Sequence, residues 1–311
     1  MTGVDGMLTM SDVLDRLAVL PQYLLPKRLL TVLAGKCATS QARWWTRLAI
    51  PWFIARYGVN MAEAVRPAAA YASFNDFFTR ALRDGARPLA PVDFVSPVDG
   101  VVIACGRIEA GQLLQAKGHR YSTRALVGGD ARQAAQFDDG EFATLYLSPK
   151  DYHRIHMPCN ARLMRMIQVP GQLFSVNPRT TRGVPGLFAR NERVVCLFES
   201  DPGPFIMVLV GATIVGSIAT VWHGVVNPPR PAEVCEWRYD DTAIMLRQGE
   251  EMGRFLLGST VVMLFQKGMM CLCADWQPGR RVQMGEAMVC DGEEKWEGSA
   301  PSAIQNIVRG R

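Results

Sequence analysis

The segment "EEMGRFLLGSTVVMLFQKG", residues 250–268, has the composition of a buried β-strand. Apolar residues occupy positions 255–257 and 261–265, but the centre holds Gly258, Ser259 and Thr260. A glycine inside a strand packs against nothing and costs conformational entropy, so it often marks a bulge or a close approach of another backbone. From these residues alone, the segment predicts one strand with a bulge and two hydrogen-bonded hydroxyls.

Similar short apolar runs, rich in β-branched and aromatic residues, recur from Phe94 onward between glycines, prolines and asparagines. They include "GVVIACGRI", "EFATLYLS", "ARLMRMIQV", "RVVCLFES" and "PFIMVLVGATIVGSI". This spacing is typical of a β-rich domain of the sandwich or barrel type.

Residues 11–80 have a different, helical pattern. Ser11 is placed to cap a first helix, and we expect the helical stretches to break at Pro21, Pro26 and Pro51. Ser73 and Asp76 have the spacing of a capping box. The segment "RDGARPLAP", residues 83–91, reads as a linker. The sequence therefore predicts an α+β protein with a helical region at 1–90 and a β-rich domain at 91–311.

Charge is unevenly distributed along the 311 residues, whose net charge is only +5. Between residues 13 and 80 there are nine lysines or arginines and three acids, and Trp44, Trp45 and Trp52 lie among the basic residues. Short basic helices with tryptophans suit a segment lying on an anionic membrane surface. The alternative is that these helices pack on the protein with their charges in water. The longest uncharged runs, about ten residues, are too short to span a bilayer.

The N-terminus lacks the apolar core of a secretory signal, and eight cysteines are scattered without a CxxC pair. We therefore expect reduced, mostly buried thiols and a location on the cytoplasmic side of the cell. The mild net charge indicates no nucleic-acid partner.

Few residues can perform acid–base chemistry, since the chain has four histidines. His153 and His156 lie in "SPKDYHRIHMPCN", and Asp99 lies in "FVSPVDGVV". Asp-Gly is also a common hairpin turn, and the histidines could be structural. A zinc site using His153, His156 and Cys159 lacks an evident fourth ligand, so we expect no metal. An Asp, a His and a Ser at 99, 156 and 259 could instead form a nucleophile, a base and an orienting carboxylate.

Eight stretches, spread in order over nearly the whole chain, give it a specific resemblance to one family. The chain resembles the phosphatidylserine decarboxylases of the bacterial, membrane-associated type. The stretches are "FNDFFTRALRDGARPL", "SPVDGVV", "LLQAKGHRYS", "LYLSPKDYHRIHMPCN", "VPGQLFSVNP", "LFARNERVVCLFE", "VGATIVGSI" and "EEMGRFLLGST".

The resemblance implies that the chain cuts itself between Gly258 and Ser259. The serine hydroxyl would attack the glycine carbonyl, converting the amide to an ester, and β-elimination followed by hydrolysis would leave a pyruvoyl group at Ser259. Glycine leaves this carbonyl unshielded and its backbone free to strain. By the same resemblance, His156 would activate Ser259 and Asp99 would orient His156. His153 would act on the substrate as the proton donor.

The resemblance also implies a substrate, a cofactor and partners. The covalent pyruvate would serve as the electron sink for decarboxylation of phosphatidylserine to phosphatidylethanolamine, with no external cofactor. The two chains from one precursor would form a heterodimer that dimerises again, peripheral on the cytoplasmic face of the cell membrane. His119, Phe174, Ser175 and Asn177 are the candidates for binding the headgroup. An unprocessed, non-enzymatic membrane-binding paralogue is the alternative, and a zinc hydrolase is a weaker one.

Overall fold

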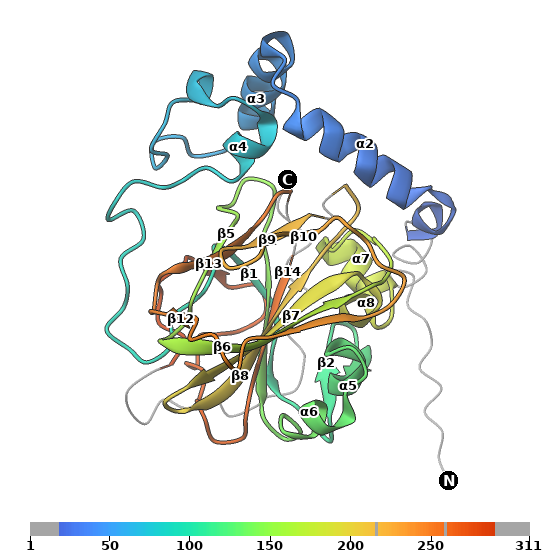
Figure 1. Cartoon of the computed structure of the whole chain (residues 1–311), viewed down its shortest axis with the longest axis vertical. Coiled ribbons are helices and arrows are strands. Elements are labelled where there is room, and N and C mark those ends of the chain that lie inside the picture. The colour runs from blue at the N-terminus through green and yellow to red at the C-terminus, as the bar shows by residue number, and fades with distance from the viewer. Residues whose placement is uncertain (1–18, 215–216, 258–259, 290–311) are drawn as a thin grey trace.

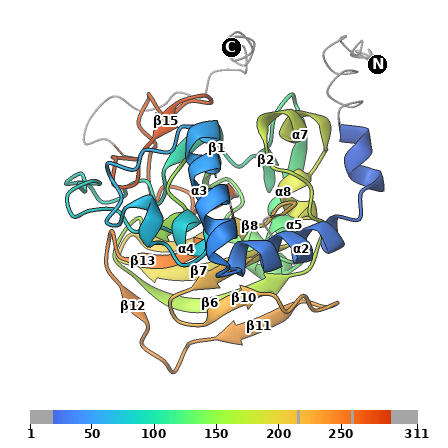
Figure 2. The same ribbon diagram turned by 90° about the horizontal axis from the view of Figure 1, so that it is seen from above.

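The structure, a computed structural model, describes residues 19–214, 217–257 and 260–289. Three helices lie at one end of the molecule, above the ends of two antiparallel sheets (Figure 1). They are α2 (Lys27–Thr39), α3 (Arg43–Tyr57) and α4 (Phe74–Phe78). The view from above shows α2 and α3 running across the strands beneath them (Figure 2). The predicted α+β class, with short N-terminal helices, is confirmed.

The large sheet contains nine strands within the described residues. Eight follow one another in the order β11-β6-β7-β8-β14-β4-β1-β15, and β12 pairs with the end of β6. Because the order ends at β11 and β15, the sheet is open. The strands are β1 (Gly100–Arg107), β4 (Glu141–Tyr146), β6 (Ala161–Val169), β7 (Arg193–Ser200), β8 (Gly203–Val210), β11 (Cys235–Arg238), β12 (Met245–Leu246), β14 (Thr260–Phe265) and β15 (Arg281–Val282).

A four-stranded sheet, in the order β10-β9-β13-β5, covers one face of the large sheet. The shorter helices and a hairpin cover the other face. The small sheet consists of β5 (Arg154–His156), β9 (Ile218–Thr220), β10 (Gly224–Asn227) and β13 (Glu251–Phe255). The opposite layer consists of β2 (Gln112–Leu114), β3 (Arg120–Ser122), α5 (Thr123–Leu126), α6 (Ala131–Ala135), α7 (Pro178–Gly183) and α8 (Leu187–Arg190).

Strand β14 shows why the layers pack in this way. All six of its residues are buried, because β4 and β8 flank it and both of its faces are covered. Alternate side chains of a strand point to opposite faces. Val261 and Met263 accordingly enter the core beneath the small sheet, whereas Val262 and Leu264 enter the core beneath the helices. The continuous apolar run in the sequence is therefore a central strand.

Residues 250–268 form two strands in different sheets, so the prediction of one bulged strand is wrong. β13 pairs with β5 and β9 in the small sheet, and β14 pairs with β4 and β8 in the large sheet. The chain changes sheets between Phe255 and Thr260. Periodicity shows that a segment is extended, but it does not show which strand lies beside it.

The helical region differs from the prediction at two prolines. Pro51 lies inside α3, and Pro21 lies inside the helical residues 19–24, so neither ends a helix. Pro26 does separate two helices, as expected. The capping box is confirmed in its central contact, because the Ser73 hydroxyl accepts a hydrogen bond from the Asp76 N–H at 3.1 Å. Ser11 lies outside the described residues.

The expectation that the cysteines are reduced holds for six of them but is wrong for Cys273. Cys273 is disulfide-bonded, whereas Cys37, Cys105, Cys159, Cys196, Cys235 and Cys271 are free. Spacing along the sequence does not show which thiols the fold brings within bonding distance.

Candidate active site

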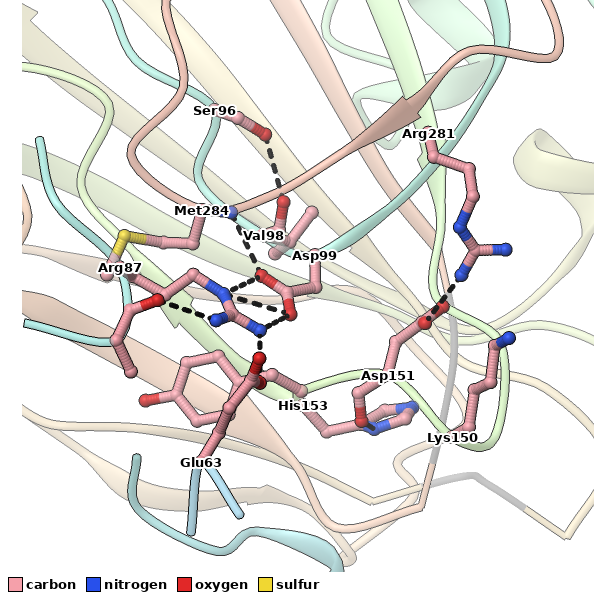
Figure 3. A network of polar contacts seen from close by, with 12 residues as sticks. Glu63, Arg87, Ser96, Val98, Asp99, Lys150, Asp151, His153, Arg281 and Met284 are labelled. Atoms are coloured by element: carbon pink, nitrogen blue, oxygen red, sulfur yellow. Dashed lines mark hydrogen bonds and ion pairs between the residues drawn. The ribbon is translucent and has the colours of Figure 1, made fainter. Parts of the chain in front are cut away.

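Asp99 is held by an arginine that the sequence analysis did not select. Arg87 Nη2 lies 2.6 Å from Asp99 Oδ2, and its Nε donates to Oδ1 at 2.9 Å (Figure 3). The backbone N–H of Met284 also donates to Oδ1, and Arg87 reaches Glu63 at 2.9 Å. The side chains of Arg87 and Asp99 are only 8% and 10% exposed. Hydrogen bonds to Asp99 raise the pKa of Arg87, so the cation is permanent.

Close packing explains why a glycine follows Asp99. Gly100 is the first residue of β1, and a Cβ atom on it would lie 2.5 Å from the carbonyl oxygen of Tyr146 on β4. Any side chain there would push β1 away from its neighbour. The Asp-Gly pair therefore starts a buried strand, and it does not form a hairpin turn.

His156 lies at the end of β5 and is neutral. Its Nδ1 donates to the Gly249 carbonyl at 2.8 Å, which fixes the tautomer, and its Nε2 accepts from the Tyr152 hydroxyl at 3.0 Å. Burial lowers the pKa of His156 and raises the pKa of Tyr152 to about 12. A neutral imidazole with a lone pair on Nε2 has the protonation state that a general base requires.

The structure brings Asp99 and His156 into one neighbourhood without joining them directly. The His156 backbone N–H donates to the carbonyl of Pro97, two residues before Asp99. After burial and the nearer groups, the Asp99 charge also influences the pKa of His156, in the upward direction. However, Gly249 and Tyr152 occupy both ring nitrogens. The predicted contact between this carboxylate and this imidazole is therefore not among the hydrogen bonds of the described residues.

His153 is completely buried and also neutral. Its Nδ1 donates to the Asp151 carbonyl at 2.8 Å, and its ring lies 4.0 Å from the ring of Phe78 on α4. Burial, together with the nearby charge of Arg80, lowers the pKa of His153 to about 3. Its Nε2 has no hydrogen-bond partner among the residues that the structure describes. Because buried polar atoms are almost always paired, an unpaired imidazole nitrogen indicates a functional group.

Gly258 and Ser259 lie outside the described residues, but the chain on each side is well anchored. The Phe255 N–H donates to the His153 carbonyl at 3.0 Å, at the end of β13. Thr260 starts β14 opposite Tyr146 and Val210, and its buried hydroxyl has no hydrogen-bond partner in the described part of the chain. β5, which carries His156 and directly follows His153, is therefore bonded to β13, the strand that leads towards the proposed cleavage bond.

The candidate headgroup loop contacts the N-terminal helices. Phe174 is buried beneath Lys27, whose Nζ lies 4.0 Å from the centre of the ring. Asn177 accepts from the Thr180 N–H and caps α7, and its amide donates to the Ser175 hydroxyl at 3.0 Å.

His119 lies elsewhere, in the turn between β2 and β3. Gln115 in the same turn donates to the carbonyls of Thr181 and Val184, on the layer of α7 and α8. Among the described residues, no hydrogen bond or ion pair joins this hairpin to the side chain of His153 or His156. His119 is thus the candidate that the structure separates from the two histidines.

The described residues do not provide the ligands that the zinc-hydrolase alternative requires. His153 and His156 each use Nδ1 to donate to a backbone carbonyl. Within residues 19–214, 217–257 and 260–289, no group of three His, Cys, Asp or Glu residues could hold a metal ion.

Four residues around the two histidines were missed by the sequence analysis: Arg80, Arg87, Tyr152 and Gly249. Both arginines lie in the stretch "FNDFFTRALRDGARPL", so its resemblance to a family was the available signal. Tyr152 lies in the stretch "LYLSPKDYHRIHMPCN" and had the same signal, whereas the role of Gly249 depends on a contact across the fold and has no local signature.

Comparison with known proteins assigns this site to a class. The family model described as phosphatidylserine decarboxylase matches residues 74–290, and a second model described as PSD matches residues 17–58. The class is therefore a decarboxylase, and the non-enzymatic alternative is not supported.

Individual relatives agree with the class. The chain is 67% identical to the phosphatidylserine decarboxylase proenzyme of Albidiferax ferrireducens over 275 residues, which cover 88% of this chain and 97% of the relative. It is 65% identical to the proenzyme of the same name from Dechloromonas aromatica, with 88% and 98% covered. The proenzyme from Azoarcus sp. strain BH72 is 66% identical, with 88% and 96% covered. The chain belongs to the phosphatidylserine decarboxylase family.

Proposed function

We propose that this chain cleaves itself at Gly258–Ser259 and that the product decarboxylates phosphatidylserine to phosphatidylethanolamine. His156 takes the proton of the Ser259 hydroxyl, and the serine oxygen attacks the Gly258 carbonyl to replace the amide by an ester. Elimination releases Gly258 as a carboxylate and leaves dehydroalanine, which water converts to pyruvoyl and ammonia.

One observation carries this proposal. Two neutral histidines, each with a fixed Nδ1 proton, lie on or beside β5, and β5 is hydrogen-bonded to the strand that leads to Gly258. Ser259 must be deprotonated to attack, and His156 is in the required state. Asp99 acts on His156 through its charge and through the Pro97 backbone contact.

The described residues around position 259 suit a covalent pyruvoyl group. The unpaired Nε2 of His153 and the unpaired hydroxyl of Thr260 are polar atoms that a substrate or a carbonyl group could pair with. When formed, the pyruvoyl group supplies an electron sink for the loss of carbon dioxide. His153 handles the proton of the substrate, while Phe174, Ser175, Asn177 and His119 remain the proposed headgroup residues.

An apolar face on the N-terminal helices supports association with a membrane. The exposed fractions of Leu24, Trp44, Leu48 and Trp52 are 86%, 72%, 64% and 60%, which is unusual for side chains of this size. Exposed basic residues accompany them: Arg28, Lys36, Arg43, Arg47 and Arg56. None of the described helices has the length and apolarity that crossing a bilayer requires. We therefore propose peripheral binding to anionic lipid on the cytoplasmic face of the cell membrane.

A cavity connects this face with the cleavage region. Its volume is about 580 Å³, and its lining comes almost entirely from apolar side chains of α2 and α3, together with Phe74, Ile214 and Leu257. Leu257 is the residue before Gly258, whose bond to Ser259 is the proposed cleavage site. The cavity is suited to an acyl chain that enters from the membrane while the headgroup reaches the histidines.

This function implies the organisation proposed for the chain. Residues 1–90 would form the membrane-surface region and 91–311 the catalytic domain, self-cleaved into two chains that stay together and dimerise. The test is the denatured mass of the purified protein, followed by release of carbon dioxide from phosphatidylserine vesicles. For the wild-type protein we expect two fragments, 1–258 and 259–311, and decarboxylase activity. Ser259→Ala should give one intact 34.4 kDa chain and no decarboxylase activity. An intact wild-type chain without activity would refute the proposal.

A further inference from the structure

Arg80 is a buried cation whose hydrogen bonds are incomplete. Only 3% of the residue is exposed, and it follows directly after α4 and Thr79. Its Nη2 donates to the carbonyls of Lys150 and Asp151, at 2.9 and 3.3 Å, whereas Nε and Nη1 have no hydrogen-bond partner within residues 19–214, 217–257 and 260–289. A buried arginine in this condition is costly, so its position calls for a role beyond packing.

The two carbonyls connect Arg80 to His153. The Asp151 carbonyl accepts from Arg80 Nη2 and also from His153 Nδ1, so the guanidinium and the imidazole share one peptide group. Helix α4 packs against both side chains. The ring of Phe78 lies against His153, and the centre of the Phe77 ring lies 5.7 Å from the Arg80 guanidinium. The segment 77–80 therefore holds the segment 150–153 in one geometry.

We propose that Arg80 is the positioning residue of His153: it fixes the peptide that binds the Nδ1 proton and thereby keeps Nε2 as the bare nitrogen available to the substrate. This inference rests on the proposed function, in which His153 acts during decarboxylation. It assigns Arg80 no contact with the reacting atoms.

The charges around His153 act in the same direction. Arg80 approaches from the α4 side, and its charge lowers the pKa of His153 in addition to burial. The Asp151 carboxylate could oppose this effect, but its Oδ2 accepts hydrogen bonds from both the backbone N–H and the hydroxyl of Ser148. Asp99 and Glu63 also influence Arg80, and both are paired with Arg87. Burial and the charge of Arg80 therefore together favour the neutral imidazole.

A neutral His153 changes the order of proton transfers. Its Nε2 carries no proton before substrate binds, so His153 must first accept the proton that it later donates to the substrate carbon. The carboxylate of bound substrate and the carbanion that develops beside Nε2 favour the imidazolium, so in the complex His153 can take the proton that the substrate ammonium loses and then return it to the carbon from which carbon dioxide has left. The proton count balances without a second acid.

The kinetic test compares Arg80→Gln and Arg80→Lys with wild type on phosphatidylserine vesicles. For R80Q we expect complete self-cleavage, nearly unchanged KM and kcat lower by about 10- to 100-fold, because a displaced catalytic group mainly affects the chemical step. The acid limb of the kcat profile should move to higher pH. R80K keeps the positive charge but lacks the planar guanidinium group. Its acid limb should therefore lie at the wild-type pH, whereas its kcat should lie between those of R80Q and wild type.

Arg281→Gln is the matched control, because it removes a bond to the Asp151 carboxylate from a side chain that is 60% exposed. Its kinetics should match wild type. Wild-type kcat and an unshifted acid limb in R80Q would overturn the inference. If the wild-type protein itself did not cleave or did not release carbon dioxide, the proposed function would be refuted. Failure of the proposed function can therefore be distinguished from failure of the inference about Arg80.

A second readout does not depend on activity. With four histidines in the chain, ¹⁵N-imidazole NMR can resolve the tautomer of His153. Wild type should show a protonated Nδ1 and a bare Nε2 from pH 7.5 down to 5, whereas R80Q should titrate or exchange tautomers in this range. If R80Q does not fold, the same measurements on R80K test the inference. A wild-type kcat together with a wild-type spectrum in R80K would show that the guanidinium group is not needed to position His153.

Discussion

The carboxylate of Asp99 is bound by the guanidinium of Arg87, with 2.6 Å between Oδ2 and Nη2. Arg87 lies in the segment 83–91, which has no helix or strand of its own, and it also binds Glu63 from the helical region. The pair therefore connects the region before residue 90 with the start of β1.

Breaking this pair should destabilise the protein strongly. Arg87→Gln leaves the buried Asp99 carboxylate without a cation, and loss of one partner of a buried pair costs about 3–5 kcal/mol. We expect the free energy of unfolding, measured in urea, to fall by about 3 kcal/mol or more. Arg66→Gln, which breaks an ion pair with Asp76 whose side chains are 45% and 34% exposed, should cost about 1 kcal/mol or less. Equal losses in the two variants would contradict this account.

Self-cleavage should depend on one histidine and not on another. In His156→Ala, Ser259 has no neutral imidazole to take its proton, so the purified protein should remain a single chain, or cleave at least about 100-fold more slowly. The measurement is denatured mass against time. His223→Ala is the control, because His223 lies against the ring of Trp237, away from β5, and should process normally. Cleavage of His156→Ala at the wild-type rate would remove His156 from this role.

The buried, neutral His153 should make stability fall in acid. Its pKa is about 3 in the folded state and 6.5 in the unfolded state. The unfolded chain therefore gains a proton below pH 6.5 that the folded chain does not, and stability is lost as the pH falls from 6.5 towards 3. The slope from this group approaches ~1.4 kcal/mol per pH unit.

Urea unfolding between pH 7.5 and 5 checks this slope. His153→Gln should be less stable than wild type at pH 7.5 but should lose less stability on acidification, since His156 alone then contributes a slope of the same sign. An identical pH dependence in the two proteins would mean that His153 is protonated in the folded state.

Membrane binding should depend on the tryptophans of α3. Replacing Trp44 and Trp52 by serine removes two exposed rings from the apolar face, so partition onto vesicles containing phosphatidylserine should fall by at least about 10-fold. Val234→Ser is the matched control, because Val234 is 48% exposed but lies beside β11. Vesicle flotation measures both. An equal effect of the control, or no effect of the tryptophans, would count against this surface.

Several local features were predictable because they depend on neighbouring residues. The serine cap at Ser73 and the burial of residues 261–265 both follow from patterns only a few positions long, and both are confirmed. The prolines show the limit of such rules. Pro51 removes one hydrogen bond from α3, yet the helix continues, because Ile50 and Phe53 beside it are buried in the core that α3 forms with α4.

By itself, the sequence determined the α+β class, the buried central strand, the family motifs and the residue types available for catalysis. The tertiary structure decided which groups meet. His156 donates to the carbonyl of Gly249, 93 positions away, and Asp99 accepts from the N–H of Met284, 185 positions away. Propensity and periodicity act over one or two turns of chain, whereas tautomer, protonation state and ion pairing depend on what the fold brings within about 3 Å of each atom.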